Sequence, residues 1–169
     1  MDFTQTKNIT VLIEVLKKNN LKIMFAESMT AGLLSSEMAS IPGASSVLLG
    51  SVVCYSPMIK KSVLAVSDEL IVKYSCESRE VTKAMVYGLL TIVSDKIEEL
   101  VKTIFVAITG VASEPVNEYE VKVPVGTTFV CLIFEGTVYD FKEVFSGSRN
   151  EIRQQASDFV FRKLLDILS

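Results

Sequence analysis

Residues 22–40 read KIMFAESMTAGLLSSEMAS, and their apolar pattern changes from that of a strand to that of a helix. Its first five residues, KIMFA, form an apolar run of the length of a short buried strand. Residues 30–40 have helical spacing of their apolar side chains, and Pro42-Gly43 ends the predicted helix. A strand followed at once by a helix is typical of α/β proteins, in which helices cover a sheet.

The segments on either side repeat this alternation. Helices are expected at residues 4–18, 57–66, 78–93 and 149–168, and strands at 47–55, 103–108, 126–134 and 137–145. The last two strands are separated only by Glu135-Gly136, which predicts a hairpin, and residues 109–123 are expected to be an irregular loop. The pattern predicts a single three-layer α/β/α domain over residues 1–169, built on a mixed sheet.

Composition narrows the function classes. The 169 residues are 49% apolar and 22% charged with a net charge of -3, which excludes disorder and gives no broad basic surface for nucleic acid. The first residues, MDFTQTKN, do not form a signal peptide, and no apolar run reaches the ~20 residues of a membrane span. We therefore expect a cytoplasmic protein without nucleic-acid or membrane partners, while a homo-oligomer stays open.

The sequence contains no histidine, which excludes several kinds of catalytic and metal site. No Ser-His-Asp triad, Cys-His pair or histidine metal site can form. Cys54, Cys76 and Cys131 are far apart and show no CxxC spacing, so we expect three buried, reduced thiols rather than a metal site. Neither a metal nor a cofactor is expected.

Candidate chemistry follows the predicted strand ends, where ligands collect in such sheets. Ser28 follows the first strand, and it is either a helix cap or a nucleophile. Without histidine, its base must be a lysine, a tyrosine or a carboxylate. Tyr55 and Lys60 are five residues apart after the second strand, which can place both polar groups in one pocket. Lys60 is followed by Lys61, and either lysine could simply be solvated.

Two further segments allow two interpretations each. Thr109 and Gly110 follow the third strand, where they either bind a phosphate or supply a loop cap and an unusual backbone angle. Arg149 opens the last helix and is either a bidentate phosphate donor or a surface residue.

Seven motifs occur in order from about residue 22 to the end of the chain. They are AESMTAG at 26–32, PGASS at 42–46, CYSPMIKKSVLAV at 54–66, ESREV at 77–81, ITGVAS at 108–113, VPVGTTF at 123–129 and FSGSRNEIRQQA at 145–156. This series resembles the CinA carboxy-terminal domain family, with its patterns AESCTGG, PGSS, TYSNEAK, VSEE, TGIAGPxGG, KPVGTV and FxGDRxxIRxQ. Active members of that family are nicotinamide-nucleotide amidases of the PncC type.

The resemblance implies roles for residues of this chain. Ser28 would be the nucleophile, and Tyr55 and Lys60 would activate it. Thr109 would touch the substrate, and Arg149 would face the phosphate or the developing charge. The implied reaction is hydrolysis of nicotinamide mononucleotide to nicotinic acid mononucleotide and ammonia, without a metal.

The resemblance also implies a substrate pocket around the nucleophile. Glu27, Thr30 and Gly32 are expected to line it, together with Gly110.

The departures from the family pattern bear on the substrate. The Gly-rich segment after TGIA is replaced at residues 113–121, which include Glu114, Glu118 and Glu120. Acids near a phosphate site weaken nucleotide binding by Coulomb repulsion. Two alternatives therefore remain at this point: a catalytically lapsed nucleotide-binding or regulatory relative, and an amidase for another small amide.

Overall fold

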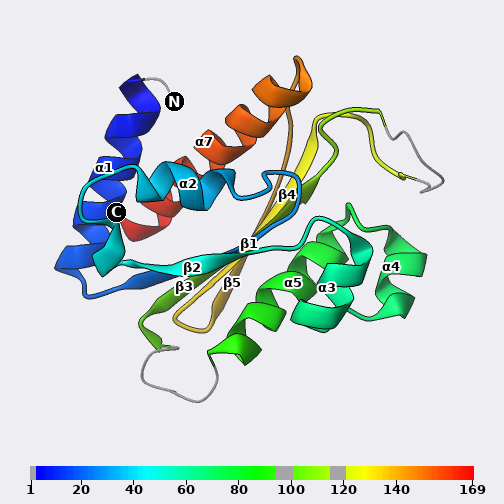
Figure 1. The fold of residues 1–169 in the computed structure, drawn as a ribbon, viewed down its shortest axis with the longest axis horizontal. Coiled ribbons are helices and arrows are strands. Elements are labelled where there is room, and N and C mark those ends of the chain that lie inside the picture. The colour runs from blue at the N-terminus through cyan, green and yellow to red at the C-terminus, as the bar shows by residue number, and fades with distance from the viewer. Residues whose placement is uncertain (1–2, 94–100, 115–120) are drawn as a thin grey trace.

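A computed structural model describes residues 3–93, 101–114 and 121–169, and its sheet has five strands. The strands are β1 (Lys22–Glu27), β2 (Leu48–Val53), β3 (Thr103–Gly110), β4 (Thr127–Phe134) and β5 (Thr137–Val144), in the spatial order β2-β1-β3-β4-β5. Strand β1 pairs in parallel with β2 and β3, whereas β3–β4 and β4–β5 are antiparallel (Figure 1). The predicted mixed sheet is confirmed.

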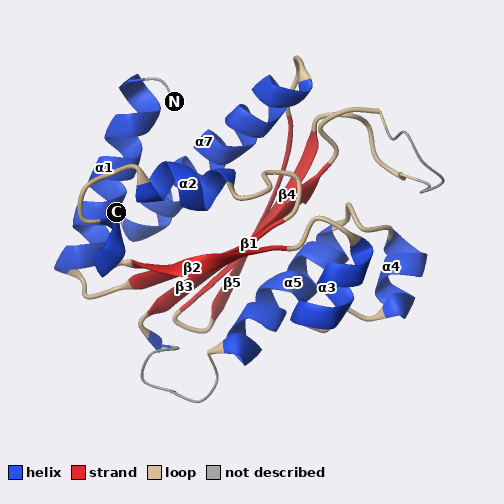
Figure 2. Cartoon of the chain, viewed as in Figure 1, coloured by secondary structure: helices blue, strands red, loops and turns tan. Residues whose placement is uncertain are grey.

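Helices cover both faces of this sheet (Figure 2). One face carries α1 (Phe3–Lys18), α2 (Leu33–Ala39) and α7 (Arg149–Leu168). The other carries α3 (Pro57–Leu64), α4 (Asp68–Tyr74) and α5 (Arg79–Ile92). A short 3-10 turn, η1 (Ala44–Ser46), precedes β2. None of the helices in the described residues is both long and apolar enough to pass through a bilayer.

Side-chain alternation along the strands explains the two cores. Phe25 and Val106 point toward α1, α2 and α7, while Ala26 and Phe105 point toward α3 and α5. The central strand β3 is buried along nearly its whole length, as expected for its continuous apolar run. A strand fixed on both faces gives the loops at its carboxyl end a rigid base.

The element order follows the sequence prediction with two differences. Helix α2 begins at Leu33, later than predicted, because residues 28–32 form a turn in which Ala31 and Gly32 have positive φ angles of 51° and 91°. Helix α4 was not predicted from the sequence. It is seven residues long and buries no side chain completely, so it lacks the apolar periodicity of a core helix. Most of the loop at 113–121, including Glu118 and Glu120, lies outside the described residues.

Candidate active site

The carboxyl ends of β1, β2 and β3 meet at one edge of the sheet because the three strands run in parallel. Ser28 follows β1, and its backbone N–H donates to the Ile108 carbonyl of β3 at 3.1 Å. Tyr55 follows β2, and Thr109 lies near the end of β3. The topology therefore brings the three predicted segments into one region.

Lys60 reaches this region from α3. Ser56 caps that helix and Pro57 occupies its first turn, so Lys60 lies at the start of the helix beside the end of β2. Its side chain is completely buried, and its Nζ lies 2.9 Å from Ser28 Oγ. The neighbouring Lys61 instead forms a 2.8 Å ion pair with Asp68 at the surface. Structure thus separates two lysines that the sequence left equivalent.

The remaining partners of Lys60 define what it can do. Its Nζ donates to the carbonyl oxygens of Cys54 at 3.0 Å and of Tyr55 at 3.3 Å. Carbonyl oxygens only accept hydrogen bonds, so two N–H groups of Lys60 are committed to them. A hydroxyl both donates and accepts. Ser28 Oγ accepts the third hydrogen bond of Lys60 Nζ and is the one of these three partners that can also donate a hydrogen bond.

Ser28 itself is free of the structural role considered for it. The residue that precedes α2 as its cap is Gly32, not Ser28. Ser28 is 5% exposed, and Lys60 Nζ is its hydroxyl's partner in the described part of the chain. A buried hydroxyl within hydrogen-bond distance of a buried amine meets the geometric requirement for a serine nucleophile with a lysine base.

The Tyr55 side chain lies in a different place from its carbonyl. Its hydroxyl accepts a hydrogen bond from Arg149 Nη2, and the ring is 53% exposed. Arg149 Nη1 donates to Ser113 Oγ at 2.6 Å. Arg149 is therefore held by two neutral hydroxyls, from the loops after β2 and β3. The backbone of Tyr55 contacts Lys60, and its phenol orients Arg149.

Thr109 joins a buried chain of hydroxyls. Its Oγ1 lies 2.7 Å from Thr82 Oγ1, and Thr82 donates to the Ser78 carbonyl at 2.6 Å. Since Thr82 has one hydroxyl proton, Thr109 must be the donor to Thr82. The lone pairs of the Thr109 hydroxyl therefore face away from this chain, and the hydroxyl can still accept a hydrogen bond.

Gly110 is required for close packing rather than for its backbone angle. Its φ is not in the left-handed region, so the interpretation of an unusual backbone angle is wrong. A Cβ at this position would lie 2.4 Å from Met29 Sδ and 2.4 Å from the Thr127 carbonyl oxygen. Met29 Sδ also accepts from Thr128 Oγ1 at 3.6 Å. The missing side chain of Gly110 lets the Ser28 turn approach β3 and β4.

Glu27 acts on the backbone. Its carboxylate is fully buried and accepts hydrogen bonds from the N–H groups of Gly32 at 2.9 Å, of Leu34 at 3.1 Å and of Ser35 at 3.1 Å. The hydroxyls of Ser35 and Ser51 also donate to it, each at 2.9 Å. These contacts satisfy the free N–H groups at the start of α2. The expected pocket-lining residue Glu27 thus fixes the turn that carries Ser28.

Thr30 and Gly32 belong to the same turn. Gly32 has φ 91°, a left-handed conformation that favours glycine. The Thr30 hydroxyl is buried and has no partner among the described residues. Its carbonyl accepts a hydrogen bond from Arg153 Nη2 at 2.6 Å.

Arg153 is the residue that sequence reasoning missed. Besides Thr30, it donates through Nε to the Met29 carbonyl at 3.0 Å. A signal was present, because Arg153 follows Arg149 by four residues in the FSGSRNEIRQQA motif, and residues so spaced share a helix face.

Electrostatics near Lys60 are set by burial. Burial raises the pKa of the Glu77 carboxyl above its ordinary value, and the nearby Lys60 charge partly offsets this effect. Burial raises the pKa of the Cys54 thiol to about 11, against the same lysine. All three cysteines are free and buried, as the sequence predicted. Across residues 3–93, 101–114 and 121–169, no group of three acids or thiols is placed to hold a metal ion.

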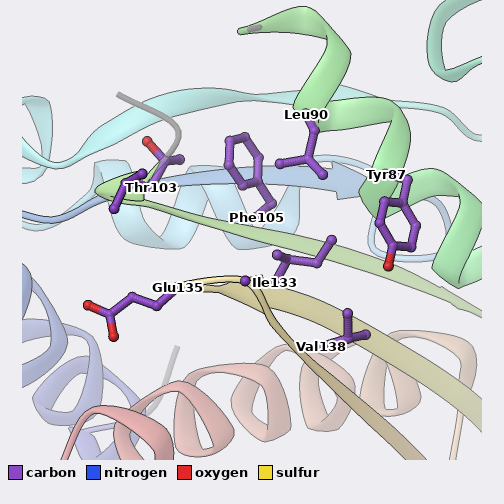
Figure 3. Close-up of a pocket in the computed structure, with 9 residues that line it drawn as sticks. Tyr87, Leu90, Thr103, Phe105, Ile133, Glu135 and Val138 are labelled. Atoms are coloured by element: carbon purple, nitrogen blue, oxygen red, sulfur yellow. The ribbon is translucent and has the colours of Figure 1, made fainter. Parts of the chain in front are cut away.

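An apolar groove of about 520 Å³ lies elsewhere, at the amino end of β3. Tyr87, Leu90, Phe105 and Ile133 point into it (Figure 3). Ser28 lies after the carboxyl end of β1, which runs parallel to β3, so the groove is at the opposite edge of the sheet. Neither Ser28 nor Lys60 lines the groove.

Comparisons with known proteins show the family to which this chain belongs. The sequence model of the CinA C-terminal domain family matches residues 5–168. The chain belongs to the CinA C-terminal domain family. It is 38% identical over 157 residues to the CinA-like protein of Petrotoga mobilis, covering 93% of this chain and 37% of that protein. It is 36% identical to the Protein MG115 homolog of Mycoplasma pneumoniae, covering 94% of this chain and 96% of that protein. The chain spans a little over a third of the length of the first of these relatives.

Solved structures of CinA proteins share the fold. The CinA superfamily protein KP700603 of Klebsiella pneumoniae has a TM-score of 0.86 at 24% identity and covers 97% of each chain. The competence/damage inducible protein CihA of Agrobacterium tumefaciens has a TM-score of 0.87 at 23% identity, covering 100% of this chain and 98% of that one. At such identities the likeness shows the fold alone.

Proposed function

We propose that this CinA domain is an amidohydrolase that uses Ser28 as its nucleophile and Lys60 as its base. The observation that carries the proposal is the 2.9 Å contact between Ser28 Oγ and a fully buried Lys60 Nζ. In the described residues, no carboxylate forms an ion pair with this lysine. Its fixed partners leave Ser28 as the only proton donor, which suits a base.

The reaction would proceed in two balanced halves. Ser28 Oγ attacks the carboxamide carbon, its proton passes to Lys60, and Lys60 then protonates the nitrogen that leaves as ammonia. A water molecule attacks the resulting ester and gives a proton to Lys60, which passes it to Ser28 Oγ as the bond to the acid breaks. The N–H groups of Met29 and Thr30 have no acceptor in the described part of the chain and are candidates to receive the oxyanion.

The substrate proposal is nicotinamide mononucleotide, as the resemblance to nicotinamide-nucleotide amidases implied. Its phosphate would bind Arg149, which is held by the hydroxyls of Tyr55 and Ser113 and has further N–H groups without a partner among the described residues. Thr109 would accept or exchange a hydrogen bond with the substrate. In this proposal Tyr55 positions Arg149 and Lys60 rather than taking the Ser28 proton itself.

An ammonia-release assay on nicotinamide mononucleotide tests the proposal. Wild type should release one ammonia per nicotinic acid mononucleotide formed, and Ser28→Ala and Lys60→Met should each lose several orders of magnitude in kcat. The double variant should lose no more than the worse single variant, because nucleophile and base act as a unit. Lys61→Met is the matched control and should keep wild-type turnover, since Lys61 pairs with Asp68 at the surface.

Phosphate recognition is tested separately by binding to Ser28→Ala. The nucleotide should bind more tightly than nicotinamide riboside, and Arg149→Ala should remove that difference. Wild type that releases no ammonia from the nucleotide would support a lapsed binding protein or another small amide. Full activity of Ser28→Ala would refute the covalent mechanism.

A further inference from the structure

Arg153 holds the backbone directly after the nucleophile. It lies on α7, and its Nε donates to the Met29 carbonyl at 3.0 Å while its Nη2 donates to the Thr30 carbonyl at 2.6 Å. Its third contact, at 3.4 Å, is the amide oxygen of Asn150. All three recorded partners are neutral oxygens, so the guanidinium charge is directed at the peptide groups of this turn.

The planarity of the peptide bond gives this contact a consequence on the other side of the turn. In a trans peptide the C=O and the N–H point in opposite directions. Drawing the Met29 carbonyl toward α7 therefore turns the Thr30 N–H away from α7. Ser28 and Ala31 close a turn by a 3.1 Å hydrogen bond. Lys60, which contacts the Ser28 hydroxyl, comes from α3 on the face of the sheet opposite to α7, so an N–H turned away from α7 is turned toward the side of that hydroxyl.

The Thr30 N–H is also unused by the protein. In the described residues it has no acceptor, although the Thr30 side chain is completely buried. A buried N–H without a partner is costly and calls for a ligand acceptor. A cation on the carbonyl of the same peptide withdraws electrons from the nitrogen and makes its N–H a stronger donor.

We propose that Arg153 is a positioning residue that fixes and polarises the Met29–Thr30 peptide so that the Thr30 N–H stabilises the oxyanion formed on Ser28 attack. This inference rests on the proposed Ser28 mechanism and deepens it. Arg153 touches no reacting atom. Arg153 acts through the Met29–Thr30 peptide, whereas Lys60 contacts the Ser28 hydroxyl directly.

Two substitutions of Arg153 separate the effect of its two-pronged hydrogen bonding from the effect of its charge. Arg153→Lys keeps the charge but loses the two-pronged donor, and Arg153→Met keeps only the apolar stem. Loss of one oxyanion donor typically costs 10²–10³ in kcat, so we expect a kcat loss on the order of 10- to 100-fold for a residue that only positions the donor. KM for nicotinamide mononucleotide should change by less than about threefold, because the interaction is made in the transition state. Arg162→Met is the matched control on the same helix, since Arg162 forms an ion pair with Asp158 at the surface.

A readout independent of the amide substrate follows Ser28 directly. With a fluorophosphonate probe, the Ser28 Oγ–P bond forms, the P–F bond breaks, fluoride leaves and the serine proton passes to Lys60. The labelling rate should fall in Arg153→Met and Arg153→Lys, and it should be unchanged in Arg162→Met. Ser28→Ala should not be labelled.

The Thr30 amide can be observed without any chemistry. In protein labelled with ¹⁵N-threonine, the signal lost in Thr30→Ser identifies Thr30. Its amide proton should move upfield in Arg153→Met, because the N–H loses the polarisation from the guanidinium. Arg153→Lys, the milder change, carries the test if the methionine variant does not fold.

The outcomes distinguish this inference from the proposed function. Wild type that is labelled by the probe but inactive on the nucleotide would refute the substrate, while slower labelling of the Arg153 variants would still support the oxyanion role. Arg153 variants with wild-type kcat, wild-type labelling and an unmoved Thr30 signal would overturn the role of Arg153 and leave the Ser28–Lys60 mechanism in place. A rise in KM alone would also overturn it.

Discussion

Replacing Gly110 with alanine should damage both the fold and the Ser28 turn. The new Cβ would lie 2.4 Å from the Thr127 carbonyl oxygen and 2.4 Å from Met29 Sδ. To reach even 3.0 Å, each neighbour must move by about 0.6 Å, and close-packed interiors resist such shifts. The Thr127 oxygen already accepts the Val111 N–H at 2.9 Å, so its movement strains the β3–β4 pairing.

The size of the effect follows from these contacts. Inserting a methyl group into a packed site costs about 1–3 kcal/mol, and contact with a rigid carbonyl favours the upper part of this range. At about 2–4 °C per kcal/mol for a chain of this length, Tm should fall by about 5–10 °C. Turnover should fall as well, because Met29 is adjacent to Ser28.

Thermal melts of wild type and four variants test this reasoning. Adding Met29→Ala to Gly110→Ala removes the contact with Sδ but not that with the Thr127 carbonyl. Gly110→Ala should therefore lower Tm less in the Met29→Ala background than in wild type, but it should still lower it. Gly136→Ala is the control for replacing a glycine without a steric clash. Its Cβ would meet nothing within 4 Å, so any loss of Tm there comes from its φ of 76° and not from a close contact. A wild-type Tm for Gly110→Ala would refute the close-approach argument.

Three further predictions concern other parts of the structure. Ala31→Gly should raise the free energy of unfolding by about 0.5–1 kcal/mol in denaturant melts, because φ 51° strains an alanine, while Ala39→Gly in α2 should lower it by a similar amount. Burial raises the pKa of Glu77, so the folded state binds its proton more tightly, and stability is lost as pH rises from 4.5 through the raised pKa. Glu77→Gln should remove this loss. A stability–pH curve of Glu77→Gln that runs parallel to that of wild type would contradict the prediction. Burial raises the pKa of Cys54 and of Cys131 to about 11, so a thiol reagent at pH 8 should react slowly with the folded protein and rapidly in denaturant; equal rates would refute their burial.

Local patterns were sufficient to predict most of the fold. The run TIFVAI at 103–108 has the length and continuity of a strand covered on both faces, and β3 is such a strand. Helix α4 escaped because no periodic apolar face marks it, although Ser67 with Asp68 and Glu69 is a helix-start signal. Short helices that bury little surface leave little pattern in a sequence.

Most residues of the candidate site could be predicted from the sequence, but their contacts could not. Motif order pointed to Ser28 and Lys60, but only the fold shows that Lys60 is buried while Lys61 is paired at the surface. Sequence spacing could not show that Tyr55 contacts Lys60 through its carbonyl and Arg149 through its hydroxyl. The hydroxyl and the carbonyl of one residue point in different directions once the backbone is fixed, and that fixing depends on contacts distant in sequence.

The span of the Arg153 contact bears on biosynthesis. Arg153 and Met29 are 124 residues apart, so the turn after Ser28 is held by a helix that is synthesised only after every described strand of the sheet. A nascent chain that ends before residue 149 would already contain Ser28, Lys60 and every strand of the sheet. It would still lack Arg153, whose guanidinium donates to the Met29 and Thr30 carbonyls. On the role proposed for Arg153, we expect Ser28 to become reactive only after residue 153 has been synthesised.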